Sequence, residues 1–116
     1  MVCKTEDLEI YKYAYSLVKE VYRLTCTFPP EEKFGLISQM RRAAVSVCAN
    51  MAEGGARIGK GEQKHFFGIA RGSISELRLF IQLANDFEWI NELKCKEILG
   101  SMNQIHAGLT TLINKE

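Results

Sequence analysis

Apolar side chains recur every three or four residues along most of the chain, the spacing that places them on one face of an α-helix. Four stretches carry this pattern, and no alternating β-branched run competes with them. The first begins near Leu8 and ends near Phe28, because Pro29 and Pro30 cannot continue a helix. Its predicted core stripe is Leu8, Tyr11, Tyr15, Val18, Tyr22 and Thr25.

The second predicted helix runs from about Glu31 to Gly54, and its leading glutamates suit the positive end of the helix dipole. Its core face is Ile37, Met40, Ala44, Val47 and Met51. The stretch GGARIGKG follows it. Four glycines in eight residues predict the most flexible connection in the chain.

A third helix is predicted from about Glu62 to Phe87, and Asn91 can cap a fourth. Their core faces are Phe66, Ala70, Ile74, Leu77, Ile81 and Ala84, and then Cys95, Ile98, Met102, Ile105, Leu109 and Leu112. Helices of about 20 to 26 residues joined by short links favour an all-α, antiparallel up-down-up-down four-helix bundle. We expect one such domain over residues 1–116. A two-helix hairpin that dimerises is unnecessary when one chain holds four amphipathic faces.

Two predicted helices carry a second apolar face. In the first helix it is Ile10, Tyr13, Leu17 and Leu24, and in the third it is Gly68, Gly72, Leu79 and Leu83. Scattered exposed apolar residues are normal, and the glycines can equally serve close packing inside the monomer. Because both faces are regularly spaced, we expect a homo-oligomer, either cyclic or dimeric, that buries them.

The composition is that of an ordinary globular protein, with 47% hydrophobic and 25% charged residues. No segment approaches the roughly 18 apolar residues of a membrane span, and the first residues lack a signal peptide's apolar core. We therefore expect a cytoplasmic protein with no membrane partner. The cysteines Cys3, Cys26, Cys48 and Cys95 are scattered and reduced, and no pattern predicts a metal or another cofactor.

Charge is unevenly distributed, although the net charge is only +1. The stretch from Gln39 to Arg78 contains seven basic residues and only three acidic ones. The seven basic residues are our candidates for nucleic-acid binding: Arg41, Arg42, Arg57, Lys60, Lys64, Arg71 and Arg78. The last four fall within about 40° on the solvent side of the third helix, over roughly 27 Å. Repeated around a ring, they would attract phosphates. The alternative is a merely solvated helix face.

A second group of polar residues follows one line of the second helix, within an arc of about 80°. This polar stripe is Gln39, Arg42, Ser46, Asn50, Glu53 and Arg57. Ser, Asn and Gln among small alanines suit hydrogen bonding at a close helix contact. We expect the stripe to hold elements in register, either within the bundle or against the next subunit.

The segment FGLISQMRRAAVSVCANMAEGGAR, followed by ARGSISEL, resembles the bacterial four-helix bundle proteins first noticed as reading frames in ribosomal-RNA intervening sequences. The resemblance covers nearly the whole chain. Matching positions are Phe34, Gly35, Leu36, Gln39, Arg41, Arg42, Ala43, Ser46, Asn50, Glu53, Gly54, Arg57, Gly72, Ser73 and Glu76. Two positions depart from the family pattern: Cys48 replaces a common proline, and Gly55 replaces a larger residue. Cys48 is expected to make the second helix locally more regular than proline would.

The resemblance implies a left-handed bundle that assembles as a homopentamer. It also implies a relation in fold to the accessory variability determinant of diversity-generating retroelements, whose basic rings bind nucleic acid and a reverse transcriptase. RNA or DNA, the chain itself and a reverse transcriptase or other protein are therefore the expected partners. The alternative is a protein-interaction scaffold with no nucleic-acid role.

Catalysis is not expected. His65 and His106 have no evident partner, and a lone helical histidine is more often a surface or core residue than a catalyst. The stretch GGARIGKG lacks the GxxxxGK[ST] spacing of a phosphate loop and has no strand before it. We predict a non-catalytic protein.

Overall fold

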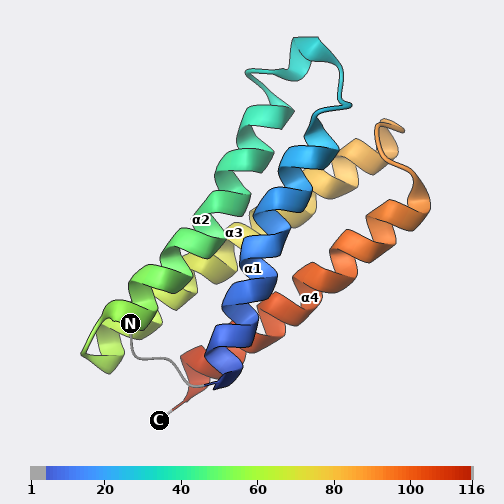
Figure 1. The fold of residues 1–116 in the computed structure, drawn as a ribbon. Helices are drawn as coiled ribbons and strands as arrows, with labels where there is room; N and C mark the ends of the chain where they lie inside the picture. The colour runs from blue at the N-terminus through green and yellow to red at the C-terminus, as the bar shows by residue number, and fades with distance from the viewer. Residues whose placement is uncertain (1–4, 116) are drawn as a thin grey trace.

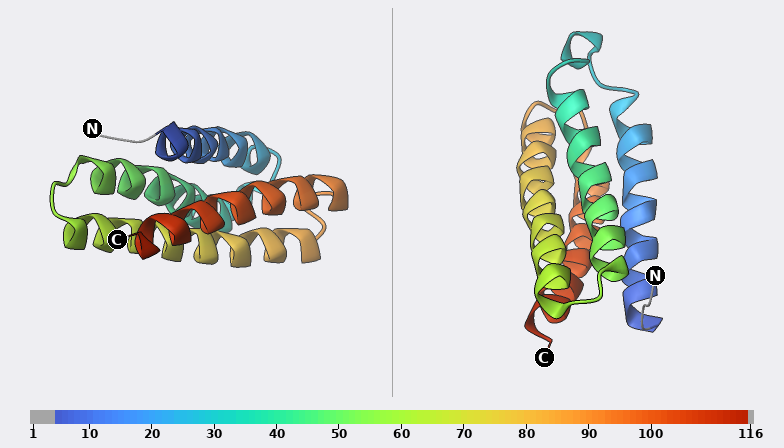
Figure 2. Two further views of the ribbon diagram at one scale, coloured as in Figure 1. Left: turned by 90° about the horizontal axis from the view of Figure 1, so that it is seen from below. Right: turned by 90° about the vertical axis from the view of Figure 1, so that its left-hand side faces the viewer.

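Four long α-helices make up the computed structural model, which describes residues 5–115 (Figure 1). They are α1 (Thr5–Thr25), α2 (Leu36–Ala56), α3 (Lys60–Asp86) and α4 (Glu92–Asn114), with a short 3₁₀-helix, η1 (Pro30–Glu32), before α2. Each long helix packs on its neighbour in sequence, and α4 returns to α1 (Figure 2). The described range holds no strand. The predicted up-down-up-down four-helix bundle is confirmed.

The bundle is elongated, with extents of 43 × 26 × 18 Å. At 27 residues and about 1.5 Å per residue, α3 runs almost its whole length. Between residues 5 and 115, no helix is both long and apolar enough to span a lipid bilayer.

The connection between α1 and α2 differs from the prediction. The first helix ends at Thr25 rather than near Phe28, and the second begins at Leu36 rather than near Glu31. The residues after the two prolines form η1, and the carboxylate of Glu32 accepts a hydrogen bond from the Leu36 amide at 3.1 Å. Glu32 therefore serves the start of α2 from the preceding turn, because the first amides of a helix lack partners within it.

The glycine-rich stretch is not the flexible connection that its composition predicted. Only residues 57–59 link α2 to α3, and no described glycine has a positive φ. Gly54 lies within α2, where an added Cβ would sit 2.7 Å from the Phe67 ring and 3.2 Å from the Gln63 carbonyl oxygen. Gly54 is thus required for the close approach of α2 to α3, and not for a turn.

The core faces predicted for α2, α3 and α4 are confirmed apart from Phe66, which is partly buried while its neighbour Phe67 takes the core position. Asn91 caps α4 as expected, since its side-chain oxygen accepts from the Lys94 amide at 2.7 Å. The largest fully buried side chains come from all four helices: Val21, Thr25, Met40, Val47, Ile74, Leu77, Ile81, Met102, Ile105 and Leu109.

The core face predicted for α1 is confirmed at Thr25 and wrong at Tyr15 and Tyr22, while Tyr11 and Val18 are partly buried against the core. Leu17 is 2% exposed, whereas Tyr15 and Tyr22 are 54% and 42% exposed. The inward face instead contains Ala14, Leu17 and Val21, and the side chain of Ile10 fills the space above Gly108 of α4. Tyrosines can stay outside because their hydroxyls remain in water. The side chain of Leu8 lies outside the described residues.

Candidate nucleic-acid interface

The polar stripe of α2 faces α3 of the same chain. Arg42 donates to Glu76 of α3 at 2.8 Å and to Gln39 at 3.0 and 3.1 Å. One turn further along, the hydroxyls of Ser46 and Ser73 lie 2.8 Å apart, next to the buried core. Arg42 and Ser46 of the stripe therefore bond to α3 of the same bundle.

The second half of the stripe closes the end of the α2–α3 pair. Asn50 donates to the carbonyl and the hydroxyl of Ser46 at 2.9 and 3.1 Å. Arg57 pairs with Glu53 at 2.8 Å, reaches Glu62 at 3.6 Å, and covers the Phe66 ring at 4.9 Å. Because these ion pairs are about half exposed, each stabilises the fold by only about 0.2 to 1 kcal/mol. Their main effect is to fix how α2 and α3 are aligned along their axes.

Arg41 is also engaged within the monomer, although the sequence placed it among the nucleic-acid-binding candidates. Its Nε donates to the Thr25 hydroxyl at 2.9 Å, and its guanidinium lies 4.5 Å from the centre of the Tyr22 ring. A second nitrogen donates to the Tyr22 carbonyl at 3.4 Å. Arg41 thus holds the last turn of α1 against α2.

Arg71 and Arg78 differ from the solvent-facing position that helical spacing predicted, because both lean onto α4 and are partly buried. Arg71 donates to the Thr110 hydroxyl at 3.2 Å, and Arg78 donates to the Asn103 side-chain oxygen at 2.7 Å. Both acceptors are neutral. Within residues 9–115, no carboxylate forms an ion pair with either guanidinium. Their charges are therefore held in place without being neutralised.

Lys60 and Lys64 complete what we call the basic row: Lys60, Lys64, Arg71 and Arg78. Neither lysine has an ion-pair partner in the part of the chain with described side chains. Three members of the row follow one another at intervals of seven residues: Lys64, Arg71 and Arg78. They therefore recur about every 10.5 Å along one side of α3. Among the seven sequence candidates, two form ion pairs with carboxylates, Arg42 and Arg57. The other five have no carboxylate partner among the described side chains: Arg41, which is held against α1, and the four members of the basic row.

His106 of α4 belongs to the same face, which the sequence did not reveal. It follows Asn103 by three residues and precedes Thr110 by four, so all three lie on one side of α4. Burial lowers the pKa of His106, and the charges of Arg78 and Arg71 lower it further. The two arginines therefore make the electrostatic potential at His106 more positive. The three- and four-residue steps from Asn103 to His106 to Thr110 could be seen in the sequence. They indicate a shared site only when the arginines of α3 are known to lie beside them.

The described cysteine and acidic side chains do not form a metal centre. Across the described side chains, no three His, Cys, Asp or Glu residues are close enough together to hold an ion. Cys48 and Cys95 are buried and Cys26 is exposed. Burial raises the pKa of the Cys48 and Cys95 thiols, so both stay protonated and poorly reactive at neutral pH.

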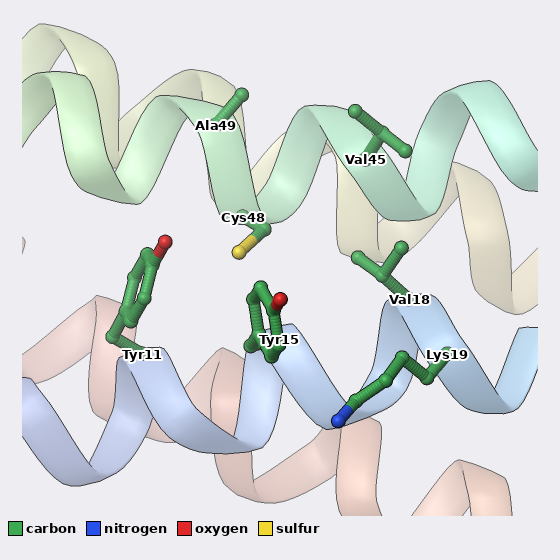
Figure 3. Close-up of a pocket in the computed structure, with 7 residues that line it drawn as sticks. All are labelled: Tyr11, Tyr15, Val18, Lys19, Val45, Cys48 and Ala49. Carbon is green, nitrogen blue, oxygen red and sulfur yellow. The ribbon is translucent and has the colours of Figure 1, made fainter.

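A mostly apolar groove of about 310 Å³ lies between α1 and α2 (Figure 3). Its lining is Tyr11, Tyr15, Val18, Lys19, Val45, Cys48 and Ala49. Tyr15 and Val45 are 54% and 42% exposed on its two sides. A hydrogen bond with Cys48 raises the pKa of the Tyr11 hydroxyl. The α1 side of the groove contains the tyrosines Tyr11 and Tyr15, which the bundle core does not fully bury.

Comparison with known proteins gave a match to a protein family and matches to solved structures. A family model described as 23S rRNA-intervening sequence protein matches residues 6–111. The fold is similar to the crystal structure of a protein with unknown function from the S23 ribosomal protein family of Bacteroides thetaiotaomicron VPI-5482, with a TM-score of 0.87 and 16% identity. That alignment covers 96% of this chain and 100% of the other, and at this identity it shows the shared fold. No match was found among curated proteins.

Proposed function

Because the chain belongs to the 23S rRNA-intervening sequence protein family, we propose that it is a non-catalytic, cytoplasmic accessory protein that binds RNA or DNA through backbone phosphates. One observation carries the proposal: Arg71 and Arg78 are fixed by neutral acceptors, while Arg42 and Arg57 are paired with carboxylates. A solvated helix face normally mixes both signs of charge. Here the positive charge of α3 is left for an external anion.

The geometry of the basic row favours contact with phosphates over the reading of bases. The row extends for roughly 27 Å along a straight helix at 1.5 Å per residue, which suits a run of successive backbone charges. Its four members are Lys and Arg, and no aromatic residue alternates with them for base stacking. Binding directed at the backbone carries little sequence preference and depends strongly on salt.

Mixing the protein with a labelled duplex at about 50 and about 200 mM salt tests this proposal. Each phosphate contact contributes about −0.9 to the slope of log affinity against log salt, so four contacts predict a loss of roughly 100-fold over that range. Fluorescence anisotropy gives both affinities. An absence of complex at the lower salt, or binding that ignores salt, would leave the protein-interaction scaffold as the function.

We also propose that the chain self-associates through the groove between α1 and α2, as a ring of five according to the family resemblance. Tyr15 and Val45 support a second copy as the occupant, because they place exposed apolar side chains on adjoining helices around one groove. Such a contiguous apolar surface favours burial at an interface. The basic row lies on α3, so this contact leaves it open.

Replacing Tyr15 with Lys is expected to weaken self-association by about tenfold or more, since a charge enters the desolvated centre of the contact. Sedimentation velocity measures the assembly, and circular dichroism confirms the fold. Tyr13→Lys is the matched control, because Tyr13 is on the same helix and 46% exposed but does not line the groove. Equal weakening by both variants, or a monomeric wild-type protein, would remove the groove from the proposal.

A further inference from the structure

We propose that the α3–α4 face holds a site for a phosphate group, and that His106 takes up a proton from solvent when the anion binds. Arg71 and Arg78 of α3 and Asn103, His106 and Thr110 of α4 form the site. The inference rests on the proposed function, because a nucleic-acid backbone is the expected source of the phosphate.

Two hydrogen bonds set the geometry of the site. Arg71 is tied to Thr110 at 3.2 Å, and Arg78 is tied to Asn103 at 2.7 Å. His106 lies between these two positions on α4, so the antiparallel helices place one guanidinium on either side of it along the bundle. A guanidinium carries five N–H donors, and each of these two uses one in its bond to α4. Donors remain for the oxygens of an anion.

Among the described residues, the two charges that act on the pKa of His106 are both positive. Arg78 and Arg71 face it from α3, and no charged side chain of α1, α2 or α4 in the described range contributes to the shift of its pKa. Neither arginine has a carboxylate partner among the described side chains, in contrast to Arg42 and Arg57. Burial and the two guanidinium charges both disfavour a third positive charge at His106 in the free protein and lower its pKa, so the imidazole is neutral near pH 7.

Binding of an oxyanion reverses this balance. A negative charge between the guanidiniums stabilises the imidazolium, so the pKa of His106 is higher in the complex than in the free protein. By linkage, the complex binds more protons, and affinity for the anion rises as the pH falls through the window between the two pKa values. Each unit of difference between them corresponds to about tenfold in affinity. Above both values the anion binds through the arginines alone.

Nuclear magnetic resonance titration of the histidine ring protons tests the coupling. The first probe is sulfate, a tetrahedral dianion whose charge is constant between about pH 5 and pH 8, compared with chloride at equal ionic strength. The second probe is an oligothymidine strand, whose phosphodiesters and bases do not titrate in this range. We expect each to raise the pKa of His106 by about 0.5 to 1 unit, and the affinity to rise by about 3- to 10-fold from about pH 8 to pH 5.5.

Two variants separate this histidine from other titrating groups. His106→Gln is expected to abolish the pH dependence of binding, because glutamine cannot take up a proton between about pH 5.5 and pH 8. His65→Gln is the matched control, because His65 is the other histidine of the chain and its side chain is exposed on α3. Its loss is expected to leave the pH dependence unchanged.

The outcomes distinguish the inference from the function on which it rests. If the oligonucleotide binds while the pKa of His106 stays constant, the inference is overturned and the proposed function stands. If sulfate raises that pKa but no oligonucleotide binds at any pH, the phosphate site stands and the nucleic-acid function fails. If neither probe binds or changes the pKa of His106, the inference and the proposed function are both wrong.

Discussion

Replacing Arg71 and Arg78 together with Gln is expected to weaken binding to a nucleic-acid duplex by roughly 30-fold at about 50 mM salt. Each partly buried guanidinium that contacts a phosphate contributes about 1 kcal/mol, and two such losses give this factor. The shortened side chains keep an amide donor near Thr110 and Asn103, whose bonds to the arginines are neutral-acceptor contacts at 3.2 and 2.7 Å. The bundle should therefore stay folded. Fluorescence anisotropy with a labelled duplex measures the affinity.

The matched control is the pair Arg42→Gln and Arg57→Gln. It removes the same formal charge from the chain, but from arginines already paired with Glu76 and Glu53 at 2.8 Å. We expect less than about a threefold loss of affinity, because a neutralised charge attracts phosphate weakly. A control pair that loses as much affinity as the basic-row pair would show that net charge alone governs binding.

Replacing Gly54 with Ala is expected to destabilise the fold by about 1 to 2 kcal/mol, although alanine favours a helix by roughly 1 kcal/mol over glycine. The added methyl group would lie 2.7 Å from the Phe67 ring and 3.2 Å from a backbone oxygen of α3. Phe67 is only 8% exposed and has little room to move. Urea unfolding followed by circular dichroism measures the change in free energy.

Gly68→Ala is the matched control for this substitution. Gly68 also lies inside a helix, but nothing lies within 4 Å of the position of its added Cβ. The variant is expected to stabilise the protein by about 0.5 to 1 kcal/mol through helix propensity. A loss of unfolding free energy in Gly54→Ala together with a gain in Gly68→Ala would support close packing at Gly54. A stabilising Gly54→Ala would contradict the α2–α3 contact described above.

Much of the bundle is predictable from local spacing. The apolar stripes of α2, α3 and α4 are strongly periodic, and Asn91 stands where a helix cap is expected, so these elements follow from the sequence. Helix α1 is different because it has apolar or aromatic residues on two faces. Small Ala14 buries completely, while Tyr15 keeps its hydroxyl in water. The spacing that starts at Leu8 fits both faces, and the stripe chosen from it was wrong at Tyr15 and Tyr22.

The candidate site depends on pairings that the sequence does not specify. Arg42 and Glu76 are 34 residues apart, and Arg78 and Asn103 are 25 apart. Helical spacing places each arginine on a face, but only the packing of the neighbouring helix decides whether a carboxylate or a neutral acceptor meets it. The same holds for His106, which gains its positive surroundings from α3.

The central claim is that the basic row of α3, and not the paired arginines of α2, contacts nucleic-acid phosphates. The slope of log affinity against log salt for a duplex tests it most directly, measured on the wild type and on both double variants. We predict a slope that is flatter by about 2 for Arg71→Gln with Arg78→Gln, and unchanged for Arg42→Gln with Arg57→Gln. Equal slopes for wild type and the basic-row variant would contradict the claim.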